Sequence, residues 1–353
     1  MTILFAILIF SLLILVHELG HFVAAKLSGV RVNEFSMFMG PAIFKKQVGE
    51  TLYSLRTIPI GGYCAMEGEN EDTDDPRSFQ KAAWWKRLII LVAGSFMNLA
   101  AGIIIFMCIF LPEKELVQPK IIEFTDCCIF NHQEGLQAGD EILELDGEKI
   151  YTNTNISMIL SLNQKVEHDV TVLRDGKKLT FENLKMAHTC LDENGTEYLH
   201  YGFAYGEVKQ ATLLDKMDYV RKITFDNVRS VRLSLQMLLS GKAGLADMTG
   251  PVGIVQIMND TAQEAENAND AIRNIFYIAG FLAINLAVMN MLPIPALDGG
   301  RVVGLLLTVA IEKITRKKLD AKYEAYIHGI GMVLLLVLMA VILFKDIFVI
   351  FKR

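Results

Sequence analysis

Two histidines one helical turn apart are the residues of this sequence best suited to chemistry. His17 and His21 belong to the segment His17-Glu18-Leu19-Gly20-His21, and residues i and i+4 of a helix project from the same face. Two imidazoles in this arrangement can bind one metal ion, and Glu18 lies beside them as a general base. The segment therefore predicts a zinc hydrolase site.

The motif lies inside an uncharged apolar run that begins at Ile3. Ionisable residues within a membrane span are costly and are usually functional. The run has no basic region before it, and no small-residue cleavage site precedes the motif, so a signal peptide is disfavoured. We expect a retained first transmembrane helix and hydrolysis inside the bilayer.

The composition is typical of a membrane core with soluble insertions. The 353 residues are 52% hydrophobic with a mean hydropathy of +0.35, too apolar for a soluble protein and too polar for spans alone. The net charge of -6 gives no support for nucleic-acid binding. The five cysteines form no CxxC pair, so we expect mainly free thiols, with one bridge from Cys190 to Cys127 or Cys128 left open.

Four apolar segments are each close to the roughly 20 residues needed to cross the hydrocarbon core. A further apolar stretch, Val302 to Ile311, is too short to span and predicts a short helix beside the third span. The four predicted spans run from about Ile3 to Ala25, Leu88 to Leu111, Ile272 to Leu292 and Ile327 to Phe344, with an extension toward Phe351 left open.

Basic residues set the predicted orientation of these spans. They concentrate in the loop from Lys26 to Arg87 and in the short loop after Ile311. Loops rich in lysine and arginine stay on the cytoplasmic side of a membrane. The N-terminus and the long segment from Pro112 to Asp270 are therefore predicted to be extracytoplasmic.

Two distant segments are predicted to bring metal ligands to the same depth. At about 1.5 Å per residue, His17 lies roughly 21 Å along its helix from Ile3, in the cytoplasmic half of a core roughly 30 Å thick. The third span also runs inward and ends at Pro293-Ile294-Pro295-Ala296-Leu297-Asp298. Because catalytic zinc commonly has three protein ligands and one open position, Asp298 is the predicted third ligand. It could instead cap the following helix.

Two asparagines in the predicted spans have alternative roles. Asn290 lies eight residues before Asp298 and is a candidate to bind the substrate backbone or a developing oxyanion. Asn290 and Asn98 could instead form hydrogen bonds between packed helices. The acidic run from Glu67 to Asp75 is expected to be a solvated loop. Surface or packing roles are expected for the other histidines, His132, His168, His188, His200 and His328.

The segment between the second and third spans has a β-rich pattern. Gly135 to Asp140 precedes a predicted strand at Glu141 to Asp146, Asn155 to Leu162 predicts a short helix, and Asp175-Gly176 is typical of a hairpin turn. This order resembles a circularly permuted PDZ domain over about Leu116 to Tyr205. PDZ domains bind extended peptides by adding a strand at a sheet edge.

Beyond this segment, Leu213 to Leu239 mixes apolar and basic residues at helical spacing. That pattern predicts an amphipathic helix at the outer membrane surface. Gly250-Pro251-Val252-Gly253 then interrupts the chain before the third span.

The sequence as a whole resembles the site-2 proteases, intramembrane zinc metalloproteases, in their bacterial PDZ-containing branch. The resemblance implies one Zn²⁺ per chain held by His17, His21 and Asp298, with Glu18 as catalytic base and Asn290 in contact with substrate. The matching segments, in family order, are His17 to His21, Gly61-Gly62-Tyr63, Gly94 to Asn98, the PDZ-like string, Gly250 to Gly253 and Asn290 to Gly299.

The resemblance also implies a membrane-re-entrant β-hairpin around residues 52–66. Within it, Gly61, Gly62 and Tyr63 would offer a sheet edge to an extended substrate. The two glycines would equally suit an ordinary turn.

The predicted fold is an α-helical polytopic membrane protein with four transmembrane helices, a membrane-associated β-hairpin region and one inserted extracytoplasmic PDZ-like α+β domain. Residues 1–112 would hold the first two spans and residues 113–206 the PDZ-like domain. Residues 207–268 would form the amphipathic helix and a connector, and residues 269–353 the last two spans.

The function implied by the resemblance is regulated intramembrane proteolysis at the cell membrane, with the active site toward the cytoplasmic half. Substrates would be pre-cleaved single-span proteins, such as anti-sigma factors or remnant signal peptides, shortened first by a site-1-type protease. The alternative is a non-proteolytic PDZ membrane scaffold with a structural metal. Glu18 disfavours it, because a structural site needs no base. A metal transporter is also disfavoured, because it would need ligands along several spans and the sequence indicates one compact site.

Overall fold

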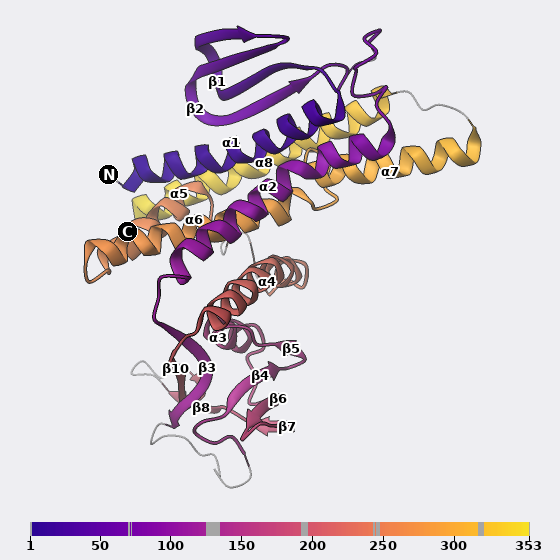
Figure 1. The fold of residues 1–353 in the computed structure, drawn as a ribbon. Helices are drawn as coiled ribbons and strands as arrows, with labels where there is room; N and C mark the ends of the chain where they lie inside the picture. The colour runs from indigo at the N-terminus through magenta and orange to yellow at the C-terminus, as the bar shows by residue number, and fades with distance from the viewer. Residues whose placement is uncertain are drawn as a thin grey trace. The chain divides into compact units, whose positions relative to one another are not determined.

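The computed structural model describes residues 2–69, 71, 73–124, 135–191, 197–242, 244, 248–316 and 321–352. The chain folds into two compact units (Figure 1). One comprises Met1–Phe106 together with Ala243–Arg353, and the other comprises Met107–Lys242.

Four helices are long and apolar enough to cross a membrane. They are α1 (Thr2–Ser28), α2 (Trp84–Phe110), α6 (Ala268–Asn290) and α8 (Ala321–Lys352). Their apolar windows carry few charges, so burial of their surfaces against lipid is favourable. The prediction of a polytopic membrane protein with four spans is confirmed at this level, while the orientation of the spans stays a prediction.

Two shorter helices accompany the spans, α5 (Pro251–Gln263) and α7 (Asp298–Thr315). The helix α5 starts at the predicted break, with Gly250 at its N-cap and proline in its first turn, where a missing N–H is tolerated. The helix α7 begins at Asp298, four residues before the short helix predicted at Val302, and it ends at Thr315. The predicted bounds were therefore too narrow.

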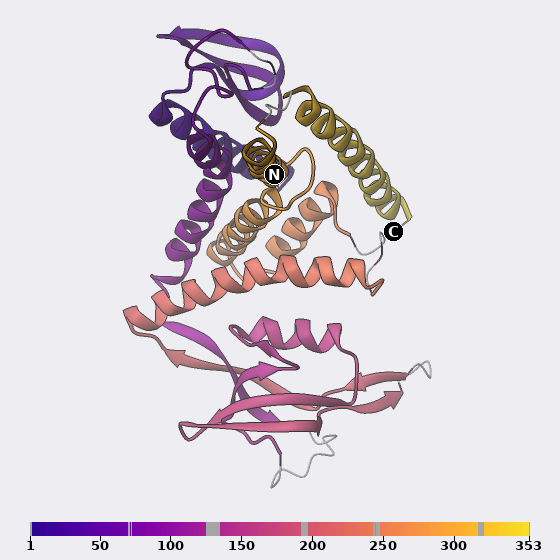
Figure 2. The same cartoon turned by 90° about the vertical axis from the view of Figure 1, so that its right-hand side faces the viewer.

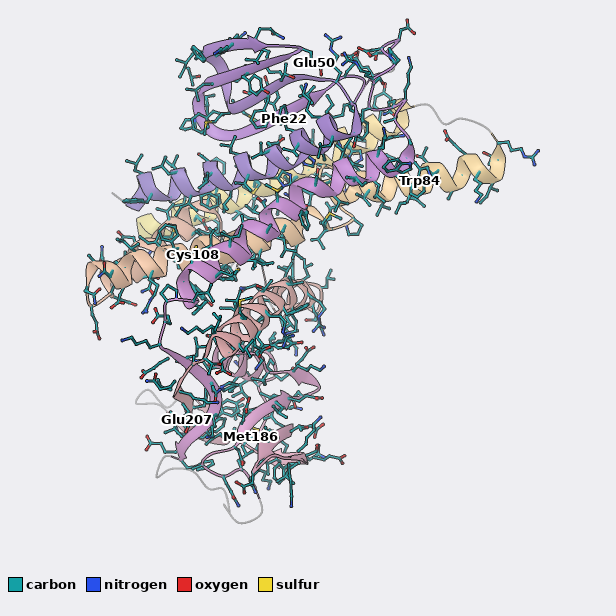
Figure 3. The ribbon with its side chains drawn as sticks, in the orientation of Figure 1. Phe22, Glu50, Trp84, Cys108, Met186 and Glu207 are labelled. Atoms are coloured by element: carbon teal, nitrogen blue, oxygen red, sulfur yellow. The ribbon has the colours of Figure 1, made fainter. Side chains whose placement is uncertain are left out.

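A long twisted hairpin lies along α1 and is formed by β1 (Val32–Val48) and β2 (Thr51–Met66) (Figure 1). The predicted bounds of this hairpin were wrong: residues 52–66, where a whole hairpin was expected, form the single strand β2, and its partner β1 was not predicted. Phe22 lies on α1 next to this hairpin (Figure 3). Its ring lies 5.0 Å from that of Phe35 and 6.0 Å from that of Tyr53. These aromatic contacts fix the hairpin on one face of α1.

The strand β2 bends so that both of its ends pair with β1, one on each side of it. The start of β1, from Glu34 to Met37, pairs on one side with Leu52–Leu55 and on the other with Gly62–Ala65. The segment from Gly62 to Ala65 therefore has one paired side, and no other described strand pairs with its second side. Among the described residues it is therefore a strand edge, the kind of position at which backbone donors and acceptors can pair with another strand.

The second unit is built on an antiparallel sheet of six strands. Its order is β10-β3-β4-β6-β7, with β5 paired to β4, and a separate pair is formed by β8 and β9. The strands are β3 (Glu115–Phe124), β4 (Glu141–Leu145), β5 (Glu148–Lys149), β6 (Glu167–Arg174), β7 (Lys177–Lys185), β8 (His188–Leu191), β9 (Glu197–His200) and β10 (Phe203–Gln210).

Two helices accompany this sheet, α3 (Asn153–Leu162) and α4 (Leu213–Leu239). In Figure 2, α3 lies between the sheet and α4. Apolar side chains of α3, Ile156 and Ile159, are buried with Ile142 of the sheet. The carboxylate of Asp226 on α4 accepts hydrogen bonds from side chains of Thr152 and Asn155 at the start of α3, so α4 belongs to this unit.

Several local predictions for this unit correspond to observed elements. The predicted strand from Glu141 is β4, the predicted short helix is α3, and Asp175-Gly176 lies in the turn between β6 and β7. That these elements form a PDZ domain stays a prediction, as does the membrane-surface location of α4. Cys127 and Cys128, candidates for a bridge to Cys190, lie outside the described residues.

Candidate metal centre

The donor atoms of the three predicted metal ligands converge. Oδ2 of Asp298 lies 3.1 Å from Nε2 of His17 and 3.3 Å from Nε2 of His21, and the two Nε2 atoms are 3.2 Å apart. With zinc–ligand bonds of about 2.0–2.1 Å, neighbouring donors of a tetrahedron lie roughly 3.3 Å apart. The three donors therefore have the mutual spacing of a zinc site.

Hydrogen bonding of the His21 ring supports the same interpretation. Its Nδ1 lies 2.8 Å from the carbonyl oxygen of Ile90, and a carbonyl only accepts, so Nδ1 carries the proton. In the neutral ring, Nε2 then presents its lone pair toward Asp298. A lone pair and a carboxylate facing each other in a buried place fit a bound cation, and a carbonyl partner for the other nitrogen is usual for metal-ligating histidine.

Glycines allow α1, which bears the histidines, and α2, which faces them, to approach each other closely. A Cβ atom on Gly20 would lie 2.4 Å from the carbonyl oxygen of Ala93, and one on Gly94 would lie 2.4 Å from Nε2 of His21. Real Cβ atoms essentially never lie this close to another heavy atom. The helices α1 and α2 can therefore meet at this depth only because both positions lack a side chain, and Gly94 leaves room for the imidazoles.

A tight turn delivers Asp298 to the histidines. Ala296 adopts a left-handed conformation with φ of +80°, which is unfavourable for a residue other than glycine. A Cβ on Gly299 would lie 2.3 Å from the carbonyl oxygen of Leu292, and one on Gly300 would lie 2.3 Å from that of Ile294. The glycine pair thus allows the turn to fold back against the start of α7.

The structure also bears on the capping alternative for Asp298. Leu297 is the N-cap of α7 and makes no side-chain capping hydrogen bond, while Asp298 is the first residue of the helix. The carboxylate instead faces His17 and His21. As a contributor to metal binding it would also sit favourably near the positive end of the helix dipole.

The candidate base and the hairpin meet beside the histidines. A Cβ on Gly62 would lie 3.7 Å from Cγ of Glu18 and 3.0 Å from the carbonyl oxygen of Ser36. Gly61 has φ of +78°, a conformation that favours glycine. The guanidinium carbon of Arg56 lies over the ring of Tyr63, 5.3 Å from the centroid of that ring. Of the three predicted hairpin residues, Gly62 is thus the one beside Glu18.

Both asparagines considered from the sequence lie at His17. The amide nitrogen of Asn98 is 3.4 Å from Nδ1 of His17, and that of Asn290 is 3.5 Å from the same atom. Asn98 was not among the predicted site residues. Its spacing from Gly94 on α2, one helical turn, was the sequence signal that could have identified it.

Comparison with known proteins identifies the family. The model described as "Peptidase family M50" matches residues 5–338. The chain belongs to this peptidase family. The enzyme predicted from the sequence is thereby confirmed as a peptidase, and the resemblance to the site-2 proteases is confirmed with it. Membership of the PDZ-containing branch stays a prediction.

Named relatives align over almost the whole chain. "Putative zinc metalloprotease CPE1693" of Clostridium perfringens is 36% identical over 98% of this chain and 98% of its own length. "Regulator of sigma-W protease RasP" of Bacillus subtilis is 28% identical, and "Zinc metalloprotease RasP" of Bacillus licheniformis is 27% identical, each over 98% of both chains.

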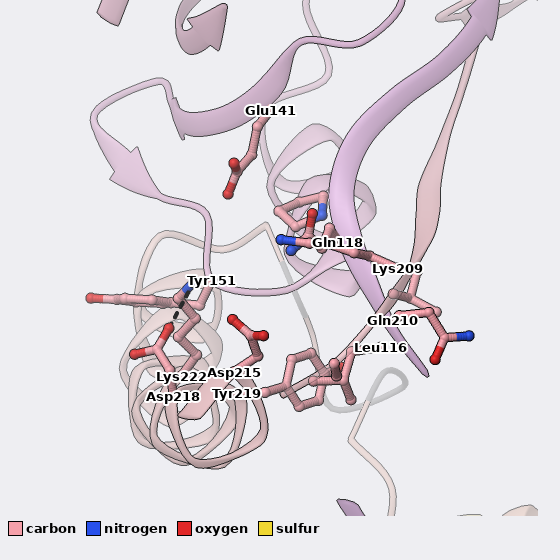
Figure 4. Close-up of a pocket in the computed structure, with 13 residues that line it drawn as sticks. Leu116, Gln118, Glu141, Tyr151, Lys209, Gln210, Asp215, Asp218, Tyr219 and Lys222 are labelled. Atoms are coloured by element: carbon pink, nitrogen blue, oxygen red, sulfur yellow. Dashed lines mark ion pairs between the residues drawn. The ribbon is translucent and has the colours of Figure 1, made fainter. Parts of the chain in front are cut away.

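A pocket in the second unit contains none of the predicted site residues. It lies between β3, β10 and the first turns of α4 (Figure 4). Its lining includes the ion pair between Lys222 and Asp218, with Nζ and Oδ2 3.1 Å apart, and the ring of Tyr219. Acidic, basic and apolar groups all line it, so its chemistry indicates no ligand class.

Proposed function

We propose that this chain is an intramembrane zinc metalloendopeptidase that performs regulated intramembrane proteolysis. The observation that supports this most directly is the convergence of His17, His21 and Asp298 between helices apolar enough to cross a membrane. Membership of peptidase family M50 and the names of its zinc metalloprotease relatives support the same reaction.

Each residue of the site has a role in the proposed reaction. His17, His21 and Asp298 hold the metal, and a zinc ion bound there supplies Lewis acidity toward water and the peptide carbonyl. Glu18 accepts the proton of the attacking water and returns it to the leaving amine. Asn290 donates its amide N–H to the substrate backbone or to the developing oxyanion.

The hairpin edge gives an extended substrate somewhere to bind. A transmembrane segment must unwind before its peptide bonds can be cut, and unwound backbone in a membrane needs hydrogen-bond partners. The edge from Gly62 to Ala65 has such partners, and Gly62 lies beside Glu18. Adding the substrate as a further strand would carry its backbone to the metal site. Gly61 and Gly62 keep side chains out of the way, and Tyr63 continues the edge.

The substrates proposed for this site are single-span membrane proteins already shortened by a site-1-type protease. Anti-sigma factors are one candidate class, suggested by the name of the Bacillus subtilis relative, and remnant signal peptides are another. Basic loops favour a cytoplasmic location for the ends of α1 and α6 that bear the site. The sheet unit would then be extracytoplasmic, where a PDZ-like module can screen substrates before cleavage.

A single substitution tests the proposed reaction. Glu18→Gln in the full-length protein should abolish cleavage of a tagged single-span substrate in membranes while zinc content stays near one per chain. Glu266→Gln, which changes an exposed carboxyl in the same unit, is the control and should cleave normally. Undiminished cleavage by Glu18→Gln would contradict the proposed mechanism.

A further inference from the structure

The two nitrogens of the His17 ring face different surroundings. Nε2 faces the other two ligands, 3.1 Å from Oδ2 of Asp298. Nδ1 faces two carboxamides, those of Asn98 and Asn290. In His21 the corresponding Nδ1 has a carbonyl partner, that of Ile90. If both imidazoles bind one metal through Nε2, Nδ1 of His17 also carries a proton and needs an acceptor.

Asn98 has an acceptor that lacks a partner. Its side chain is 1% exposed, and its Oδ1 is buried without a hydrogen bond to any described residue. The amide nitrogen, which cannot accept, is the atom that lies 3.4 Å from Nδ1 of His17. A half-turn of the carboxamide exchanges oxygen and nitrogen within nearly the same volume. After that exchange, Oδ1 of Asn98 would accept a hydrogen bond from the Nδ1–H of His17.

Burial distinguishes Asn98 from Asn290. Asn98 lies on α2 one turn after Gly94, and a Cβ on Gly94 would touch Cε1 of His17 at 2.7 Å, so this face of α2 lies against the His17 ring. Asn290 is half-buried at the end of α6 and can turn toward a substrate. The enclosed Asn98 cannot do so.

We propose that Asn98 is a positioning residue for His17. Its carboxamide oxygen accepts the Nδ1–H of His17 and thereby fixes the tautomer and the ring orientation that direct Nε2 at the metal. The proposal rests on the proposed function, since it presumes that His17 binds zinc. It leaves Asn290 available for the substrate, so the two asparagines have separate tasks.

Zinc affinity of the purified full-length protein, measured by competition with a chelator, tests this role. Asn98→Leu keeps the approximate volume and removes the acceptor, and it should weaken zinc binding about 10- to 100-fold. Asn98→Asp restores an acceptor and should bind zinc within a few-fold of the wild type. Ser95→Ala is the matched control, because Ser95 is equally enclosed on α2 and hydrogen-bonds to no described residue.

A double-mutant cycle separates positioning from helix packing. Combined with His17→Ala, Asn98→Leu should weaken zinc binding no further, because its effect acts through His17. Additive losses, wild-type affinity in Asn98→Leu, or equal losses in Asn98→Leu and Asn98→Asp would overturn the proposal. A wild-type protein without bound zinc would overturn the proposed function itself, which is a distinguishable result.

Discussion

A Cβ atom on Gly94 would lie 2.4 Å from Nε2 of His21. A side chain on α2 at this position would therefore occupy the space that the metal and its ligands require. We predict that Gly94→Ala reduces zinc content and cleavage together. Overpacking of this kind costs about 1–3 kcal/mol, which corresponds to about 5- to 150-fold weaker binding.

The control for Gly94→Ala is Gly329→Ala on α8. A Cβ on Gly329 would meet no atom within 4 Å, so the same chemical change should leave zinc content and activity unaltered. Equal zinc content in both variants, measured on protein purified in detergent, would contradict the assignment of Gly94 as the space beside the metal.

An ion pair joins the helix that bears Asp298 to the segment after the hairpin. The guanidinium of Arg301, one turn after Asp298 on α7, binds the carboxylate of Glu69, three residues after β2 ends. Both side chains are partly buried, so removing one partner leaves a charge with poor solvation, at a cost of about 1–3 kcal/mol. We predict that Arg301→Glu and Glu69→Arg each lower cleavage about tenfold, with partial recovery in the double variant.

The more exposed pair of Arg273 and Asp270 provides the comparison for this charge reversal. Exposed pairs contribute little, and this one lies at the start of α6, away from the metal ligands. Its reversal should change cleavage by less than about threefold. Recovery in the Glu69/Arg301 double variant distinguishes a specific pair from general charge effects in the same cleavage assay.

The sequence predicted those features that depend on local pattern. The four spans follow from long apolar runs, and the pairing of His17 with His21 follows from helical periodicity. Asp298 could be predicted because the depth reached by a span can be calculated from its length. The spans and the His17–His21 pair are each set by residues close together in the chain, whereas the placement of Asp298 joins two distant segments through the depth that their helices reach.

Features that depend on distant contacts were missed. The strand β1 has no clean alternation, because Phe38 and Gly40 both have positive φ and the register shifts around them, so its pairing is visible only in three dimensions. The contact of Asn98 with His17 likewise depends on how closely α1 and α2 approach. That approach is set by Gly20 and Gly94 together, and neither glycine alone predicts it.

The turn before Asp298 is supported from α8. The backbone N–H of Ala296 donates to Nδ1 of His328, 3.0 Å away, and a Cβ on Gly331 would lie 2.4 Å from Cβ of Pro295. We predict that Gly331→Ala displaces the turn and reduces zinc content, whereas Gly329→Ala, two residues earlier on the same helix, does not. Identical zinc content in the two variants would show that α8 has no part in positioning Asp298.

Acid stability of the second unit should depend on Asp146. Burial of its carboxyl opposes ionisation, but hydrogen bonds from Lys165, His168 and the backbone N–H of Asp169 outweigh it and hold the pKa of Asp146 below its usual value. His168 is fully buried, in agreement with the packing role expected from the sequence.

The direction of this effect follows from linkage between protonation and folding. Because the pKa of Asp146 is lower in the folded state, its stabilising contribution is present above the unfolded pKa of about 3.9 and is lost as pH falls through the folded value. We predict that Asp146→Asn lowers the thermal unfolding midpoint of the β-sheet signal at pH 7, and that its difference from the wild type shrinks toward pH 3.

Asp175→Asn is the matched control for this prediction. Asp175 is exposed and has φ of +49° before a glycine, just as Asp146 has φ of +50° before Gly147. A difference that stays constant from pH 7 to pH 3, or an equal effect of Asp175→Asn, would contradict the assigned role of the Asp146 carboxylate.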